Sequence, residues 1–357
     1  LIRRVEEGGC PAAVSGLQPV QRACVGAAVA AACGRPAVFL CGDEREVQVL
    51  SADLETLTGR RPVTLLGREW QFRPGAVGSR DWERSRLAAL YALAQGDAPV
   101  VVATADGLMA RTLPPETLRS LAITLEVGGQ AELGALAEQL LSAGYTRCEQ
   151  VEGVGQFALR GGILDVFSPL MDQPVRCEFF DDEIDSMGAF DPGTQRRTRN
   201  VSSARILPAA EVLPHCAPGG LPGLADQLTA LAEKLAKKQK TEAIVQTLRE
   251  DAERLRSGAA PGAADRYLAA IYPTVTAGVH YLPPDAVVFL SESGRVDERV
   301  KNTVLQQKQD VEALLSAGVL AGEYAHLTLT AEELYAALED FPVILEDSLP
   351  TSRHPLR

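Results

Sequence analysis

The sequence predicts an α/β protein in which parallel-sheet segments, covered on both faces, flank a small α+β insert of antiparallel strands. Near both ends, short continuous apolar runs alternate with amphipathic helical stretches. The middle is a series of short strands joined by turns rich in Gly, Asp and Pro. With 357 residues, 46% of them hydrophobic, the chain is long enough for roughly two to three domains with real cores.

The first segment, residues 1–122, is expected to be an α/β lobe. Asp43 stands where it would cap a helix whose apolar positions follow with a spacing of three and four residues. A second helix is expected over 81–94, and a short one from Asp106. Strands are expected at 37–41, 62–66, 99–103 and 121–127.

The second segment, residues 123–208, is expected to be the inserted α+β domain. A helix over 131–143 should end at Gly144. The short, Gly-, Asp- and Pro-rich connections after it favour antiparallel hairpins. Strands are expected at 156–160, 163–168, 174–180, 184–190 and 203–207.

The third segment, residues 209–357, should begin with a linker at 214–223, which holds three prolines and three glycines. Residues 224–256 form either one long helix or a helical hairpin, and their lysines (234, 237, 238 and 240) are interpreted as a solvated face. The α/β alternation then resumes, with a capping box at Thr330 and Glu333. We therefore expect discontinuous α/β lobes with the second segment inserted between them. Further elements are expected at 286–290, 300–315 and 342–345.

Composition excludes several classes of protein. The net charge of −12 disfavours a wide surface for a phosphate backbone. No apolar run approaches the roughly 18 residues of a membrane span. Seven cysteines without a C-x-x-C pair indicate reduced core thiols in a cytoplasmic protein. A start at Leu1, with no signal peptide after it, suggests a piece cut from a longer chain.

A phosphate-binding loop would need the pattern G-x-x-x-x-G-K-[ST], in which the lysine reaches the phosphates and the hydroxyl holds magnesium. The candidate is residues 14–21, which keep one glycine, Gly16, and have Pro19 and Val20 where the lysine and the hydroxyl are wanted. No lysine precedes position 234. We predict a degenerate P-loop that serves as a structural turn, without nucleotide or other cofactor.

Two acidic groups could suggest metal chemistry. Asp43 and Glu44 resemble a Walker B pair, but their place at a helix start favours capping. The acidic run 181–185 lacks the spacing and the glycine of a calcium loop, so a solvated hairpin turn is expected there. The sequence also has no G-x-S-x-G and no H-E-x-x-H motif. We predict no catalytic residues and no metal site.

The strand expected at 174–180 carries a candidate binding face. Alternation places Val175, Cys177 and Phe179 on the core side, and Arg176, Glu178 and Phe180 on the other. Arg160 ends the strand before it, next to Gly161 and Gly162. An exposed aromatic beside arginines is typical of a binding hot spot. From the pattern alone, a Phe180 tucked under a loop with solvated arginines is an equally good interpretation.

The same residues carry a family resemblance. Segments 156–169, 174–186 and 190–192 resemble the second domain shared by UvrB and the bacterial transcription–repair coupling factors (Mfd). Weaker similarity covers 79–91 and 206–211. UvrB has an intact P-loop and a tyrosine-rich DNA-clamping hairpin. Here the P-loop is degenerate, and residues 66–77 contain Trp70 and Phe72 but no tyrosine. This is similar to the amino-terminal region of the coupling factors.

The resemblance implies a partner and three contact residues. In that family the middle domain docks UvrA, and the docking positions fall on Arg160, Arg176 and Phe180. Gly161-Gly162 is the UvrB form of the motif, a departure that leaves these three positions intact. The ATP-driven motor and the contacts with RNA polymerase and DNA lie outside this chain. The family's distal C-terminal domains pack on the UvrA surface.

Three functions follow as hypotheses. The leading hypothesis is a non-catalytic module that recruits UvrA during transcription-coupled nucleotide excision repair. The alternative is a nucleotide-dependent, UvrB-like helicase fragment, which the missing lysine and hydroxyl argue against. A weaker third is a small-molecule α/β enzyme whose site is assembled only in space.

Overall fold

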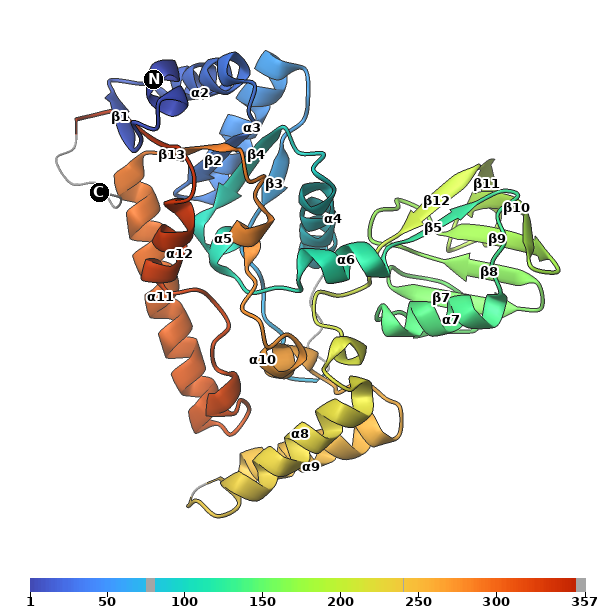
Figure 1. Cartoon of the computed structure of the whole chain (residues 1–357). Coiled ribbons are helices and arrows are strands. Elements are labelled where there is room, and N and C mark those ends of the chain that lie inside the picture. Colours follow the sequence, from blue (N-terminus) through green and yellow to red (C-terminus); the bar gives the residue numbers. More distant parts are fainter. Residues whose placement is uncertain (75–80, 240, 351–357) are drawn as a thin grey trace. The chain divides into compact units, whose positions relative to one another are not determined.

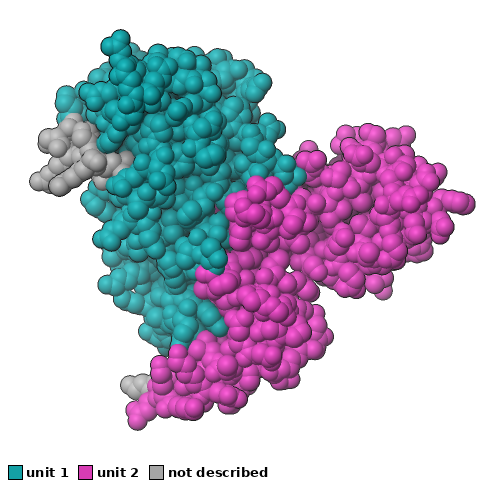
Figure 2. Space-filling model, viewed as in Figure 1, with its two compact units in different colours: residues 1–70, 89–112, 274–357 teal, residues 71–88, 113–273 magenta. Residues whose placement is uncertain are grey.

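The computed structural model describes residues 1–74, 81–239 and 241–350 (Figure 1). The chain divides into two compact units (Figure 2). Unit 1 comprises Leu1–Trp70, Ala89–Thr112 and Thr274–Arg357. Unit 2 comprises Gln71–Ala88 and Leu113–Pro273. Helix α4 (Asp81–Gln95) contributes residues to both. Each unit is therefore assembled from segments that are far apart in the sequence.

Unit 1 is built on one six-stranded sheet with the strand order β1-β14-β13-β2-β4-β3. All of its pairings are parallel. Strands from the two ends of the chain lie side by side, because β13, orange in Figure 1, pairs with β2, which is blue. The predicted α/β class with a parallel sheet is confirmed, and the segments expected to form separate lobes share one sheet. Its strands are β1 (Ala12–Ser15), β2 (Ala37–Cys41), β3 (Val63–Leu65), β4 (Val100–Thr104), β13 (Val287–Ser291) and β14 (Val343–Asp347).

Helices cover both faces of this sheet, so every residue of β2 and β13 is buried. Phe39 and Phe289 stack on one face, with ring centroids 4.9 Å apart. A Cβ atom at position 26 would lie 2.4 Å from the Phe39 ring, so only glycine lets α2 approach this closely. The helices of unit 1 are α1 (Ile2–Glu6), α2 (Pro19–Cys33), α3 (Glu44–Thr58), α5 (Ala105–Met109), α11 (Ser293–Ser316) and α12 (Ala331–Leu338), with 3₁₀ turns η3 (Gly278–Tyr281) and η4 (Gly322–Tyr324).

Both helix caps predicted for this unit are present. The Asp43 carboxylate accepts a hydrogen bond from the Glu46 N–H at 2.8 Å. Thr330 and Glu333 form the reciprocal capping box that opens α12. These bonds satisfy N–H groups that a helix start leaves without partners.

Unit 2 contains a six-stranded sheet with the order β11-β10-β9-β8-β7-β6. Its pairings are antiparallel except that of β6 with β7. Helix α7 (Leu133–Ser142) covers the inner face through Leu136 and Leu140, which join the same core as Phe157. The strands are β6 (Thr146–Arg147), β7 (Gln156–Arg160), β8 (Ile163–Val166), β9 (Val175–Phe180), β10 (Glu183–Phe190) and β11 (Arg197–Asn200).

One predicted strand belongs elsewhere. Residues 121–127 were expected in the parallel sheet, but β5 (Ile123–Glu126) pairs antiparallel with β12 (Ser203–Ile206) in a separate two-stranded sheet. The prediction is wrong because Leu125 is buried while Thr124 and Glu126 are exposed. Such alternation is typical of an antiparallel strand with one solvated face, whereas the strands of a doubly covered parallel sheet are continuously apolar.

The remaining part of unit 2 is helical. The 224–256 stretch is a hairpin of two helices rather than one long helix. The expected linker at 214–223 contains regular structure, because Pro214 begins a 3₁₀ turn and Pro222 lies in the first turn of α8, where proline is tolerated. The helices are α6 (Pro115–Leu121), η1 (Pro214–Cys216), α8 (Gly220–Leu235), α9 (Glu242–Arg256), η2 (Ala264–Tyr267) and α10 (Leu268–Ile271).

The seven cysteines are free thiols, as predicted. The expectation that they lie mostly in the core is wrong, because burial is complete only at Cys41 and Cys177, and Cys24 is exposed. Within 1–74, 81–239 and 241–350, no helix combines the length and apolar character needed to cross a membrane.

Candidate functional site: two arginine–carboxylate clusters

The outer face of the antiparallel sheet carries the three residues predicted to bind a partner. Along β9 the side chains alternate as predicted: Val175 and Cys177 are buried, and Arg176 and Glu178 are half-buried on the opposite face. Phe180 is 80% exposed at the end of the strand. Phe179 packs against the core and is only partly buried. The interpretation that tucks Phe180 under a loop is therefore wrong.

A turn of unusual backbone geometry presents Phe180. Asp181 and Asp182 connect β9 to β10, and Asp181 has a φ of 57°. This left-handed conformation is one that Asp tolerates better than most residues. The acidic run 181–185 thus begins in the predicted hairpin turn, but its last three residues lie in β10 (Glu183–Phe190). Among the residues that the structure describes, no group of three or more His, Cys, Asp or Glu side chains could hold a metal ion.

The two arginines are joined by a carboxylate that the sequence did not single out. Asp165, on β8, lies opposite Arg176 in the sheet register and is 0% exposed. Its Oδ1 accepts from Arg176 Nε at 2.7 Å, and its Oδ2 accepts from Arg176 Nη2 at 2.9 Å. Arg160 Nη2 donates to the same Oδ2 at 2.6 Å. We call Arg160, Asp165 and Arg176 the Asp165 cluster.

Arg176 is also held from the ring side. Its guanidinium carbon lies 4.7 Å from the centroid of the buried Phe190 ring. The hydrogen bonds to Asp165 raise the pKa of Arg176 above its ordinary value, so it stays charged. The Arg176 and Arg160 side chains remain 23% and 47% exposed. One buried anion therefore fixes two partly exposed cations, with one positive charge in excess.

A second cluster lies in unit 1, at the carboxyl edge of the parallel sheet, where the degenerate P-loop was predicted. Gly16 follows β1 with a φ of 86°, and α2 begins at Pro19. Gln18 and Gln21 form a capping box across this start. Val20 is exposed.

The spacing of the motif corrects one detail of the sequence interpretation. Counted from Gly16, the eight-residue pattern places Gln21 at its second glycine, Arg22 at its lysine and Ala23 at its hydroxyl. Pro19 and Val20 therefore fill variable positions, and assigning them to the lysine and hydroxyl was wrong. The hydroxyl is still missing, and a cation stands where the lysine would be.

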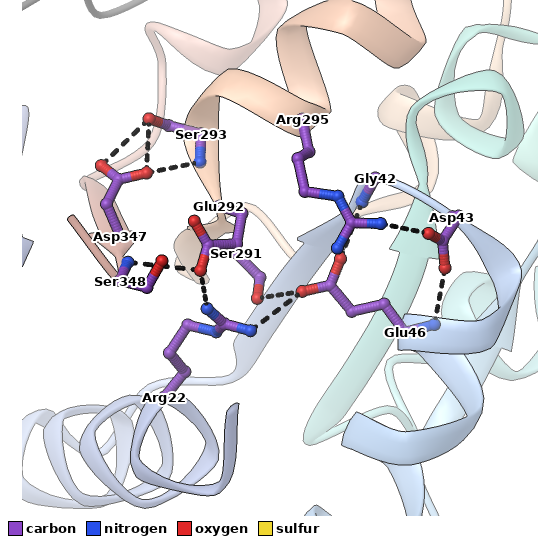
Figure 3. Close-up of polar contacts among 10 residues, drawn as sticks. All are labelled: Arg22, Gly42, Asp43, Glu46, Ser291, Glu292, Ser293, Arg295, Asp347 and Ser348. Carbon is purple, nitrogen blue, oxygen red and sulfur yellow. Dashed lines mark hydrogen bonds and ion pairs between the residues drawn. The ribbon is translucent and has the colours of Figure 1, made fainter. Parts of the chain in front are cut away.

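That cation is enclosed by the chain's own carboxylates (Figure 3). Arg22 is 5% exposed. Its Nη1 donates to Glu292, and its Nη2 lies 3.4 Å from Glu46 Oε1. We call Arg22, Glu46 and Glu292 the Arg22 cluster. A cavity of about 280 Å³ beside it is lined by Pro19, Arg22, Asp43, Arg45, Glu46, Val49 and Arg295.

The carboxylates of this cluster are held by further hydrogen bonds. Ser291 Oγ donates to Glu46 Oε1 at 2.7 Å, and the Gly42 N–H donates to Glu46 Oε2 at 3.2 Å. The Ser348 N–H donates to Glu292 Oε1 at 3.2 Å. The guanidinium is thus held by carboxylates that are themselves fixed by the chain's own hydrogen bonds.

Neighbouring acids have structural roles as well. The Glu46 N–H holds the pKa of the Asp43 carboxyl below its ordinary value, as expected for a capping residue. Asp347 accepts hydrogen bonds from the N–H and the hydroxyl of Ser293 at 2.8 and 2.9 Å. The sequence interpretation missed Glu346 and Asp347, although an acidic pair that directly follows an apolar strand was a readable signal.

Glu346 is the most unusual of these acids. It is fully buried, and neither of its carboxylate oxygens has a hydrogen-bond partner among the residues that the structure describes. Burial raises its pKa from 4.5 to about 8, although nearby Arg22 opposes the shift. Glu346 is therefore largely protonated at neutral pH.

Comparison with known proteins identifies the class of protein to which this chain belongs. A family model described as the UvrB interaction domain matches residues 123–211, which hold the antiparallel sheet and the Asp165 cluster. The chain is thus a UvrB-like α/β protein that carries a UvrB interaction domain.

More specific relatives are transcription-repair-coupling factors. That of Bacillus subtilis is 29% identical over 322 residues, 89% of this chain and 27% of the relative. That of Myxococcus xanthus is 35% identical over 253 residues, 68% of this chain and 20% of the relative. That of Escherichia coli is 34% identical over 178 residues, 49% of this chain and 15% of the relative. The chain corresponds to a UvrB-like region of this family, as predicted, and spans about a quarter or less of these relatives.

Proposed function

We propose that this chain is a non-catalytic docking module that binds UvrA through the outer face of its UvrB interaction domain, and so recruits UvrA to stalled transcription in nucleotide excision repair. The observation that carries the proposal is the 80% exposure of Phe180 at the end of the strand that carries Arg176. A large apolar side chain kept in water next to charged donors is the composition of an interface hot spot.

The three residues would have distinct roles. Phe180 would supply the apolar area that the partner covers. Arg160 and Arg176 would supply charge-assisted hydrogen bonds to carboxylates or carbonyls of UvrA. Asp165 leaves the pair with one net positive charge, which favours an acidic patch on the partner.

The absence of catalysis is proposed from the residue types at the carboxyl edge of the parallel sheet. Phosphoryl transfer relies on positioned cations and a magnesium-binding hydroxyl. Ala23 has no hydroxyl, and the Arg22 guanidinium is bound to Glu46 and Glu292. Motor activity, and contacts with RNA polymerase and DNA, would belong to other parts of such a polypeptide. Its distal domains could cover the same UvrA-binding face. The setting we propose is the cytoplasm.

Titration calorimetry of UvrA into this chain tests the proposal. We expect saturable binding, weakened about thirtyfold by Phe180→Ala, which corresponds to about 2 kcal/mol. Leu170→Ala is the matched control, because Leu170 is another exposed large apolar residue of the same unit but lies outside β9. Equal affinity of the wild type and Phe180→Ala would remove Phe180 from the site, and no binding by the wild type would refute the function.

A further inference from the structure

The outer face of the antiparallel sheet poses an electrostatic problem. Arg160 and Arg176 project from β7 and β9, on either side of β8. Two guanidinium groups this close repel each other, and each long side chain has many rotamers to lose when a partner binds. Without a restraint, both effects would weaken docking.

The buried Asp165 carboxylate reduces both the repulsion between the two guanidinium groups and their freedom to change rotamer. It is 0% exposed and uses both carboxylate oxygens, which accept three hydrogen bonds of 2.6–2.9 Å from the two arginines. The contact with Arg176 is two-pronged, which fixes the plane of that guanidinium as well as its position. The Phe190 ring closes the other side of Arg176.

The geometry also determines which donors remain for a partner. Arg176 uses Nε and Nη2 on Asp165, and Arg160 uses one nitrogen. Among the described residues, Nη1 of Arg176 and both Nε and Nη1 of Arg160 donate to no protein group. These nitrogens remain for the partner, while the carboxylate itself lies beneath the surface.

We propose that Asp165 is a positioning residue of the UvrA-docking surface: it fixes Arg160 and Arg176 in a binding-ready arrangement before the partner arrives. This inference rests on the proposed function for its partner, but not for its geometry. Preorganisation of this kind raises affinity by lowering the entropy lost on binding. Its effect reaches UvrA only through the two arginines.

The direction in which Asp165→Asn changes the affinity for UvrA distinguishes a positioning role of Asp165 from a purely electrostatic one. Asp165→Asn keeps the side-chain volume and removes one negative charge, so an account based on charge alone predicts tighter binding to an acidic patch. Positioning predicts weaker binding, by about tenfold or more, since charge-assisted bonds of this kind are among the strong ones. Glu178→Gln is the matched control. It removes the same charge from the same face, where Glu178 bonds Ser186 and neither arginine.

Calorimetric titration of UvrA with both variants gives the first result. Weaker binding for Asp165→Asn, with unchanged or tighter binding for Glu178→Gln, supports positioning. Equal tightening of both would overturn it. If Asp165→Asn fails to fold, Arg176→Lys replaces it. That variant keeps the charge but loses the two-pronged contact, and unchanged affinity would again overturn the inference.

A second measurement separates this inference from the proposed function. The Nε–Hε NMR signal of Arg176 reports directly on the bond to Asp165, with no partner present. We expect a signal protected from exchange in the wild type and in Glu178→Gln, and at least tenfold faster exchange in Asp165→Asn. Equal protection in all three refutes positioning even if UvrA binds. Loss of protection without any UvrA binding supports the geometry and refutes the function.

Discussion

The two arginine–carboxylate clusters are near mirror images in charge. In the Arg22 cluster one cation lies between two anions, Glu46 and Glu292, and is almost completely buried. In the Asp165 cluster one buried anion lies between two cations that remain partly exposed. The same ion-pair chemistry thus leaves a negative excess at one site and a positive, reachable excess at the other. The numbers of cations and anions in a cluster, and the burial of its arginines, determine whether an arginine stabilises the fold or remains available to bind a ligand.

The largest effect is expected from Arg22→Ala. Removing one partner of a buried ion pair leaves carboxylates uncompensated, and we expect a loss of about 3–5 kcal/mol of unfolding free energy. Urea denaturation measures it. The control is Arg295→Ala, which breaks a 2.5 Å pair with Asp43 whose two side chains are 55% and 39% exposed, and should cost less than about 1 kcal/mol. Equal losses from both variants would refute the contrast in burial.

Glu346, which lies near Arg22, makes the stability of the folded protein depend on pH. Its pKa of about 8 in the folded protein exceeds the ordinary value of 4.5, so between these values the native state binds more protons than the unfolded state. Its contribution to stability is therefore lost as pH rises from 4.5 toward 8, by roughly 1.4 kcal/mol for each pH unit within that window. Glu346→Gln should flatten this slope in urea denaturation series at several pH values. If the dependence of the unfolding free energy on pH is unchanged in Glu346→Gln, another group is responsible for it.

Phe179 and Phe180, which end strand β9 near the Asp165 cluster, are expected to differ in their contributions to stability. Phe179→Ala should lower the stability of unit 2 by about 2–3 kcal/mol, near or below the low end for core phenylalanines, because the ring is only partly buried. Phe180→Ala should change stability by less than about 0.5 kcal/mol. Melting curves of both variants decide this. Similar losses in the two variants would mean that Phe180 is part of the core.

The smallest effect on stability is expected from the addition of nucleotide. A ligand at about 100 times its dissociation constant adds roughly 2.7 kcal/mol, whereas ATP with magnesium should leave the melting temperature of this chain unchanged. Ala23→Thr combined with Arg22→Lys is the informative variant, since it restores two of the three missing residue types, the lysine and the hydroxyl, and leaves Gln21 at the second glycine. Stabilisation of the wild type by ATP would favour the nucleotide-dependent alternative.

Periodicity predicted most of the elements, but pairing was harder to infer. The alternation in β9 was sufficient to assign Arg176 and Phe180 to the outer face, because side chains in a strand alternate whatever its neighbours are. The partners of β5 could not be inferred, because four residues do not specify which sheet they join. Asp165 was missed for a related reason: its role depends on β7 and β9 lying on either side of β8. The Phe190 contact likewise depends on tertiary structure.

The order of strands in the parallel sheet has a consequence for synthesis on the ribosome. One edge of β2 pairs with β4, but the other waits for β13, which is made only after residues 123–211 have left the ribosome. The antiparallel domain, with contiguous strands, can therefore fold while the nucleus of the parallel sheet still has an open, apolar edge. Such an edge is a template for wrong pairing. We expect nascent chains that end before Val287 to depend on chaperones, and those that extend past Asp347 to be released from them.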